Sequence, residues 1–259
     1  NPGIDGSTAT GDVDGNNALG GLAGFNTEPV RDSSATGNVT GDGHNVSGLV
    51  GRNKGTIRRA SATGDVDGGR AVGGLVGNNS GSGATVSESY AAGAVNGSNS
   101  VGGLVGRNYG EVTTSNATGV VNGTSALGGL VGDNRIGGIV TESYATGNVS
   151  TPTATSVGGL VGISTSGVVN DSYATGNVSG DVSVGGVAGD VRTGEGDDPN
   201  GIVSRTYATG SVSGNTNVGG IVGAAQGGFT GPNLNVTESY WDTVSVGQPN
   251  AVGGGFGAT

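Results

Sequence analysis

The chain contains no cysteine and no methionine, and only one histidine, one tryptophan and six prolines among its 259 residues. Without cysteine it forms no disulfide, so its stability has to come from packing of the chain on itself. No stretch approaches the roughly 18 consecutive apolar residues that indicate a membrane-spanning helix. The missing initiator methionine and the start inside a repeat predict a processed or excised chain, from which any signal peptide has been removed.

Basic residues are also scarce, because ten Lys and Arg stand against twenty Asp and Glu and give a net charge of −10. Phosphate backbones are bound by a basic stripe, so this balance argues against a nucleic-acid partner. The one basic cluster in the sequence comprises Arg52, Lys54, Arg58 and Arg59. We interpret it as a solvated corner, with a surface-contact site as the alternative.

Glycine, in contrast, occurs 60 times, and it recurs at regular spacing. The octapeptide SYATGNVS stands at 143–150 and again at 172–179, and looser copies run through the whole chain. The glycine of this element recurs every 26 to 34 residues, at Gly11, Gly37, Gly64, Gly93, Gly119, Gly147, Gly176 and Gly210. Such a period argues against a disordered Gly-rich linker, and collagen is excluded because glycine is not at every third position.

Two apolar positions follow the same period and predict the core. A valine stands two residues after each repeat glycine, at Val13, Val39, Val66, Val95, Val121, Val149, Val178 and Val212. A second element of the form V-G-G-L-V-G is centred on Leu22, Leu49, Leu75, Leu104, Leu130, Leu160, Val187 and Ile221, with a degenerate copy at Phe256. Nine repeat units therefore account for residues 1–259, and 239–259 form a degenerate terminal repeat.

Each unit is rich in Val and Thr, with short apolar runs bounded by Gly, Asn, Asp or Ser, and shows no helical stripe. This pattern predicts an all-β fold, a parallel β-solenoid of about nine coils of 26–34 residues in a single domain. Strands about 4.8 Å apart would give a rod roughly 40 Å long. Equivalent residues then lie above one another, with Val149 pointing inward and Asn148 and Ser150 outward.

The glycine pair in the second element leaves two interpretations open. In a regular strand Val72 and Leu75 would point to opposite faces. Either the pair bends the chain so that both side chains enter the core, which we favour, or the strand is covered on two sides. The second covering layer could belong to the same chain or to a neighbouring molecule.

The repeated pattern SYATGNVSG followed by VGGLVG resembles the GLUG motif of bacterial and archaeal surface proteins, which include large adhesins and the stalks of immunoglobulin-cleaving metallopeptidases. The segment 239–257 is similar to the one that often closes a GLUG array. The resemblance implies an extracellular structural or adhesive region. The zinc-binding helix motif of the peptidases has no counterpart here, so it does not imply their activity.

Oxygen-bearing side chains suggest two further kinds of site. The insertion GEGDDPNG is a candidate calcium site through Glu195, Asp197, Asp198 and Asn200, and Asp12, Asp14 and Asn16 form a weaker one; no other cofactor is expected. N-x-S/T sequons, candidates for glycosylation, begin at Asn38, Asn45, Asn78, Asn96, Asn116, Asn122, Asn148, Asn170, Asn177 and Asn235.

Catalysis is not expected. The single histidine, His44, lies in a polar stretch that predicts a solvated imidazole. Glu88, Glu142 and Glu238 occupy equivalent repeat positions that do not fall in adjacent coils, so they do not predict a catalytic carboxylate pair.

Two exposed columns remain. Tyrosines recur three residues before the repeat glycine or its equivalent, at Tyr90, Tyr144, Tyr173, Tyr207 and Tyr240, and we interpret them as a packing ladder, with a carbohydrate platform as the alternative. Threonines form a second column at Thr10, Thr36, Thr63, Thr118, Thr146, Thr175 and Thr209, which makes ice binding a remote alternative function.

The sequence thus predicts a secreted, extracellular or cell-surface structural protein, either a self-assembling filament subunit or a surface stalk. The alternative is an excerpt of a large adhesin that binds host, cell or glycan surfaces. The expected partners are copies of the chain end to end, other surface proteins or glycans.

Overall fold

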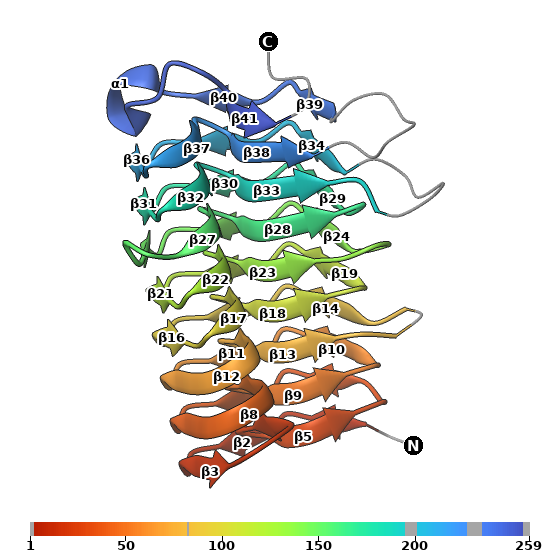
Figure 1. The fold of residues 1–259 in the computed structure, drawn as a ribbon. Helices are drawn as coiled ribbons and strands as arrows, with labels where there is room; N and C mark the ends of the chain where they lie inside the picture. The colour runs from red at the N-terminus through yellow and green to blue at the C-terminus, as the bar shows by residue number, and fades with distance from the viewer. Residues whose placement is uncertain (1–2, 82, 195–200, 227–234, 256–259) are drawn as a thin grey trace.

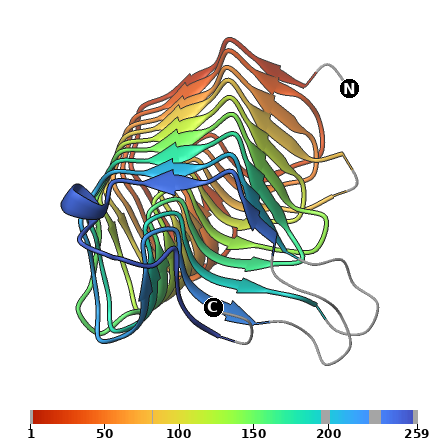
Figure 2. The same cartoon turned by 90° about the horizontal axis from the view of Figure 1, so that it is seen from above.

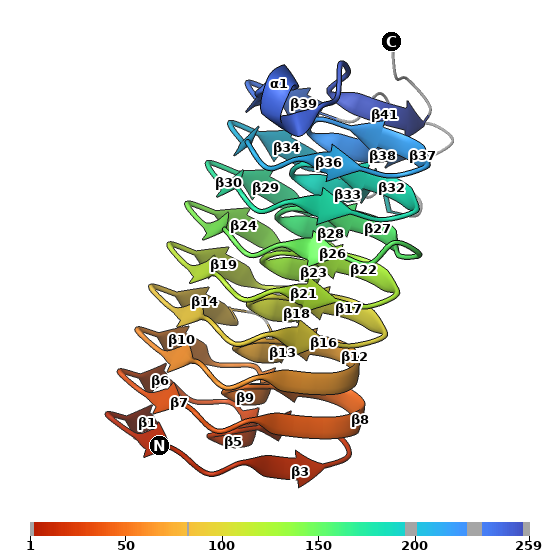
Figure 3. The same ribbon diagram turned by 90° about the vertical axis from the view of Figure 1, so that its left-hand side faces the viewer.

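The computed structural model describes residues 3–81, 83–194, 201–226 and 235–255. It confirms the predicted fold, a parallel β-solenoid in which four parallel sheets run along the stack of coils (Figure 1). Three of the sheets contain nine strands each, one strand per coil, so the nine-coil prediction is also correct. Figure 3 shows the same stack from the side, with the coils in sequence order from the first to the last.

We name the sheets A to D in the order in which the chain enters them. Sheet A consists of β1 (Ile4–Asp5), β6 (Val30–Arg31), β10 (Thr56–Arg58), β14 (Thr85–Ser87), β19 (Glu111–Thr113), β24 (Ile139–Thr141), β29 (Val168–Asn170), β34 (Ile202–Ser204) and β39 (Asn235–Thr237). Sheet B consists of β2 (Thr8–Ala9), β7 (Ser34–Ala35), β11 (Ser61–Ala62), β15 (Tyr90–Ala91), β20 (Asn116–Ala117), β25 (Tyr144–Ala145), β30 (Tyr173–Ala174), β35 (Tyr207–Ala208) and β40 (Tyr240–Trp241).

Sheet C has 14 strands because most coils contribute two of them. They are β3 (Val13–Gly15), β4 (Leu19–Gly20), β8 (Val39–Ser47), β12 (Val66–Gly73), β16 (Val95–Asn96), β17 (Asn99–Gly102), β21 (Val121–Asn122), β22 (Ser125–Gly128), β26 (Val149–Ser150), β27 (Thr155–Gly158), β31 (Val178–Ser179), β32 (Val182–Gly185), β36 (Val212–Ser213) and β37 (Thr216–Gly219). Sheet D consists of β5 (Ala23–Asn26), β9 (Val50–Asn53), β13 (Val76–Asn79), β18 (Val105–Asn108), β23 (Val131–Asn134), β28 (Val161–Thr165), β33 (Ala188–Arg192), β38 (Val222–Gln226) and β41 (Val252–Gly255).

The coils enclose two apolar cores instead of one. The larger core lies between sheets A, B and D and contains the leucine ladder represented by Leu49, Leu75 and Leu104. The smaller core lies inside the lobe formed by sheet C, where the valines that follow the repeat glycines, such as Val66, face a second valine such as Val72. Figure 2, a view along the stack, shows the chain of each coil passing around both regions.

This division corrects the interpretation of the glycine pair. The chain does bend, at Gly74 and Leu75, between β12 and β13. However, Val72 enters the smaller core and Leu75 the larger one, and neither side chain is exposed. A Cβ on Gly73 or Gly74 would overlap backbone of the next coil, so only glycine allows the chain to cross from one core to the other at this separation.

The repeat glycine is required for a related reason. A Cβ on Gly119 would overlap the carbonyl oxygen of Gly93 in the preceding coil, and the same collision recurs at each later repeat glycine. Gly11 belongs to the first described coil, and a Cβ there would meet nothing within 4 Å. The repetition of A-T-G therefore follows from the closeness of the coils.

Two buried polar ladders also join the coils. Between sheets D and A, each asparagine amide donates to the amide oxygen of its equivalent one coil further on, over 2.8–2.9 Å, in the series Asn26, Asn53, Asn79, Asn108 and Asn134. Between sheets A and B, backbone N–H groups donate to the hydroxyl of the next coil's serine, for example from Ser115 to Ser143 over 3.1 Å. Both ladders satisfy polar groups at corners, where the sheets cannot.

The coil at the C-terminal end differs from the others. In place of a strand in sheet C it has the helix α1 (Thr243–Val246), which begins at Asp242 and ends at Gly247. Val246 is 1% exposed and packs into the smaller core, and the Gln248 amide donates to the carbonyl oxygen of Val212 over 2.9 Å. In the first coil, by contrast, the ladder residues Val13 and Leu22 are only partly buried. No helix among the described residues is long and apolar enough to cross a membrane.

The glycine collision predicts that position in the stack decides the cost of an added methyl group. Gly119→Ala should lower the free energy of unfolding by about 2 kcal/mol or more. This lies in the upper part of the ~1–3 kcal/mol range that is typical of overpacking. Gly11→Ala, the matched change in the first coil, should leave it within about 0.5 kcal/mol. Urea unfolding followed by circular dichroism measures both, and equal effects would contradict the stacking argument.

The asparagine ladder predicts a difference between two neighbours in one strand. Asn79→Ala removes two buried hydrogen bonds, the one that Asn79 accepts from Asn53 and the one that it donates to Asn108. Each partner keeps one other hydrogen bond, Asn53 to the Gly55 carbonyl and Asn108 from the Gly110 N–H. At a net contribution of about 0.5–1.5 kcal/mol for each lost hydrogen bond, the change should cost about 1–3 kcal/mol. Asn78→Ala is the control, because the Asn78 oxygen has no partner, and it should cost about 0.5 kcal/mol or less. The same unfolding measurement tests the pair.

Candidate functional site

The corner between sheets A and B carries a column of exposed, mostly charged residues. The chain turns here through a non-glycine residue with φ near 50° in nearly every coil, at Asp32, Arg59, Glu88, Thr114, Glu142, Asp171, Arg205 and Glu238. This left-handed backbone turns the chain between two short strands and points the side chain outward. Glu88, Glu142 and Glu238 thus share one structural position and lie two or more coils apart.

Opposite charges within this column pair between adjacent coils. Arg59 donates to both carboxylate oxygens of Asp32 over 2.6 and 2.7 Å, and Arg205 does the same to Asp171. The hydrogen bonds from Arg205 lower the pKa of the Asp171 carboxyl, and this pair therefore stays charged in mildly acidic solution. Arg58 pairs with Glu88 over 2.7 Å.

The predicted basic cluster is consequently divided. Arg58 and Arg59 belong to the charged column, while Arg52 and Lys54 lie at the other end of the coil, each near the ring of Phe25 at 5.9 and 5.8 Å. The four residues are thus divided between sheet D with the connection that follows it and the corner between sheets A and B.

The tyrosines lie beside the charged column, on the outer side of sheet B. Tyr144, Tyr173 and Tyr207 stack with ring centroids 4.9 and 4.7 Å apart and planes inclined by 4°. Burial, with Tyr207 and Tyr144 beside it, raises the pKa of Tyr173. Tyr90 stands apart, because its neighbour in the next coil is Asn116.

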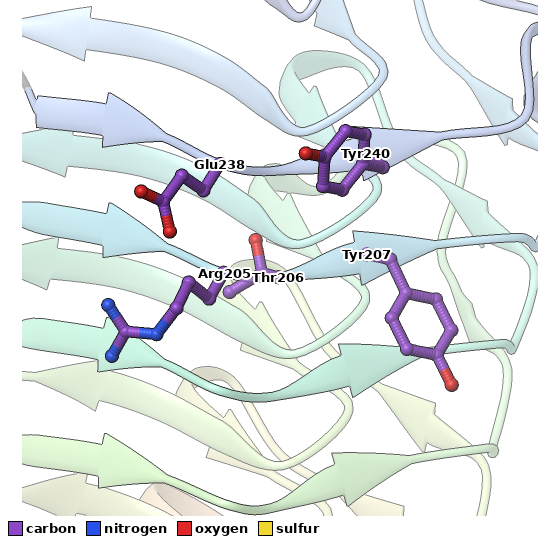
Figure 4. Close-up of a pocket in the computed structure, with 5 residues that line it drawn as sticks. All are labelled: Arg205, Thr206, Tyr207, Glu238 and Tyr240. Atoms are coloured by element: carbon purple, nitrogen blue, oxygen red, sulfur yellow. The ribbon is translucent and has the colours of Figure 1, made fainter.

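Tyr240 is the next residue in register after Tyr207, but the two rings do not stack. Figure 4 shows them pointing in different directions, with Tyr240 turned toward Glu238 and Tyr207 turned away. Between them is an open hollow of about 270 Å³. It is lined by Arg205, Thr206, Tyr207, Glu238 and Tyr240, which we call the tyrosine hollow.

The tyrosine hollow combines two exposed rings with one cation and one carboxylate. Tyr207 is 42% exposed and Tyr240 71% exposed. Aromatic faces pack against the apolar face of a sugar ring, and charged groups beside them accept and donate hydrogen bonds to hydroxyls. The arrangement is chemically suited to binding a neutral sugar or another small polar ring.

The two candidate calcium sites differ in what the structure shows of them. Asp12 accepts a hydrogen bond from the backbone N–H of Asn38 over 2.7 Å, so one carboxylate of the weaker calcium candidate already caps the next coil. The stronger candidate, Glu195, Asp197, Asp198 and Asn200, lies outside the described residues. Within the described residues no group of three or more His, Asp or Glu side chains could hold a metal ion.

The sequon asparagines differ in exposure. Asn38, Asn148 and Asn177 are exposed, and the side-chain oxygen of each accepts a backbone N–H from the next coil, which leaves the nitrogen that would carry a glycan free of those bonds. Those at Asn45, Asn78, Asn96, Asn116, Asn122 and Asn170 are half-buried, and the side chain of Asn235 lies outside the described residues. The threonines of the second column are all exposed.

Sequence reasoning missed the buried charges of sheet D. Asp133 is 3% exposed at its side chain and pairs with Arg135 over 2.7 Å, and Asp190 is 2% exposed and pairs with Arg192 over 2.6 Å. The sequence signal that could have predicted these pairs is an Asp followed by an Arg two residues later, as at 133–135 and 190–192. His44 is exposed as expected, but it lies within the long strand β8 and not in a turn.

Comparison with known proteins identifies the repeat. The family model described as "The GLUG motif" matches residues 15–40 and 97–122, each of which spans parts of two successive coils. No curated protein and no solved structure gave a significant match. The two matches fall on copies of one element that recurs through the stack, and the chain therefore contains GLUG repeats.

Proposed function

We propose that this chain is a rigid extracellular stalk with a mechanical role and no catalytic one. The observation that carries the proposal is the continuity of the stack, in which all four sheets and both apolar cores run through successive coils without a break. A rod of this kind resists bending because each coil is bonded to its neighbours along every side. The GLUG match supports a place at the cell surface, where the motif is found.

The helix α1 favours a stalk over a filament built by end-to-end stacking. A further coil laid on this end would meet α1 in the position of sheet C, where strand pairing requires an extended edge. The carbonyl of Val212 is also already bonded to Gln248. Continuous pairing of all four sheets across such a junction would require α1 to unfold.

A second candidate function, adhesion to glycans, is favoured by one observation. The tyrosine hollow lies at the same end of the rod as α1 (Figure 1), and the rings of Tyr207 and Tyr240 beside it are exposed. A stalk that presents a sugar-binding surface at one end would act as an adhesin. Ice binding has less support, because the threonine column is a single row.

The stalk proposal predicts short single particles. Negative-stain microscopy and light scattering should show monomeric rods with a core about 40 Å long, from nine layers at about 4.8 Å.

Val246→Ser should lower the free energy of unfolding by about 2 kcal/mol, because it places a hydroxyl in the smaller core. It should also loosen α1 and so promote association, because α1 blocks strand pairing at this end of the rod. Val244→Ser is the matched control, because Val244 is 88% exposed on the same helix. Fibres of uniform repeat from the unaltered chain would contradict the stalk and support the filament.

The adhesion candidate predicts binding of neutral oligosaccharides through Tyr240. On a glycan array, Tyr240→Ala should weaken binding about fivefold to tenfold, since an aromatic contact contributes roughly 1 kcal/mol. Tyr90→Ala should have no effect, because Tyr90 is similarly exposed but stands apart from the other tyrosines. Binding that is absent, or equally reduced by both changes, would exclude the tyrosine hollow as the site.

A further inference from the structure

A second hollow, of about 390 Å³, lies where sheets C and D meet. It is lined by His44, Asn45, Arg70, Ala71, Asn78 and Arg107, which we call the arginine hollow. These residues come from three successive coils and are as far as 63 positions apart in the sequence. The register of the sheets brings them together, because Arg70 pairs with His44 in sheet C and Asn78 pairs with Arg107 in sheet D.

The hollow concentrates positive charge in an acidic protein. Two of its six lining residues are arginines, one is the only histidine, and none is acidic. Among the described residues, the side chains of Arg70 and His44 make no hydrogen bond or ion pair, although the chain as a whole carries a net charge of −10. In contrast, both arginines of the corner column, Arg59 and Arg205, are paired with a carboxylate.

Unsatisfied polar atoms lie in its wall. The Arg107 Nε is buried without a hydrogen-bond partner and forms a 3.5 Å ion pair with the Asp133 carboxylate, while the Arg107 Nη2 donates to the Ser100 hydroxyl over 3.3 Å. The Asn78 Oδ1 is likewise buried and unpaired, and rotation of the amide would present its two N–H donors instead. Since buried polar groups are nearly always hydrogen-bonded, these atoms point to a ligand.

We propose that the arginine hollow binds the carboxylate or sulfate group of an acidic glycan. Guanidinium groups donate two parallel hydrogen bonds to such oxyanions, and Arg70 and Arg107 approach the hollow from its two walls. The imidazole of His44 and the amide of Asn78 supply further donors. This proposal goes beyond the stalk function and does not depend on the tyrosine hollow.

The surroundings favour a glycan over other polyanions. Beyond Arg70, the same column of sheet C continues through Asn99 and Ser125, whose amide and hydroxyl groups match sugar hydroxyls. No aromatic side chain that could stack on a nucleobase lines the hollow, and three potential cations make a patch and not the stripe that a phosphate backbone requires. No hydrophobic pocket other than the Ala71 methyl is available to anchor an acidic peptide.

The test is isothermal titration of the intact chain, at low ionic strength, with heparin oligosaccharide, oligogalacturonate, sodium sulfate, single-stranded DNA and polyglutamate. We expect at least one of the two acidic glycans to bind. Arg70→Gln and Arg107→Gln should each weaken that binding about tenfold, because a charge-assisted hydrogen bond contributes roughly 1.5–3 kcal/mol.

Arg31→Gln is the matched control, because it removes the same unit of charge from an exposed position in sheet A. It should leave the affinity within about twofold, and circular dichroism should show all three variants folded. Equal losses in the control and the hollow variants would overturn the proposal. So would the absence of glycan binding, binding of sulfate alone, or DNA or polyglutamate binding more tightly with the same dependence on Arg70.

Discussion

The close parallel stacking of equivalent backbone segments is the constraint on which this molecule depends. At the separation set by the strand hydrogen bonds, the carbonyl oxygen of Gly93 lies where a side chain on Gly119 would have to be. The same separation lets the Asn79 amide reach the Asn108 oxygen at 2.9 Å. Glycine is therefore required wherever the backbones of adjacent coils touch, and this requirement accounts for the recurrence of the repeat glycine.

Stacking also determines where binding sites can form. A repeat that is perfectly regular presents uniform columns, such as the stacked rings of Tyr144, Tyr173 and Tyr207. A hollow forms only where successive coils differ. The tyrosine hollow occurs where Tyr240 leaves the stack. The arginine hollow occurs where the residues in register differ from coil to coil, with Arg70 between His44 and Asn99 and with Arg107 between Asn78 and Asp133. Specific chemistry in this fold thus depends on departures from the repeat.

The sequence was sufficient to predict the fold because one period places equivalent residues in register, and Val66 does pair with Val95 and Val39. The sequence did not reveal the second core. The bend at Gly74 places Val72 in one core and Leu75 in the other, and a glycine pair allows such a bend without determining its direction. The arginine hollow was also beyond reach. His44, Arg70 and Arg107 occupy three different coils, and only the pairing of sheets C and D brings them to one place.

The two longest connections between sheets D and A lie in coils where the asparagine ladder has ended. Asn53 and Asn108 each bond the backbone of the residue two positions on, and the connection from sheet D to sheet A is then two residues long, from Asn53 to Thr56 and from Asn108 to Glu111. In the later coils the ladder position is occupied by Ser164, Val191 and Ala225, which cannot continue the amide series. The two longest connections, from Arg192 to Ile202 and from Gln226 to Asn235, follow Val191 and Ala225. Sheet A keeps its register on both sides of these connections, with Ile202 in register with Val168 and with Asn235, so the insertions are accommodated without disturbing the stack.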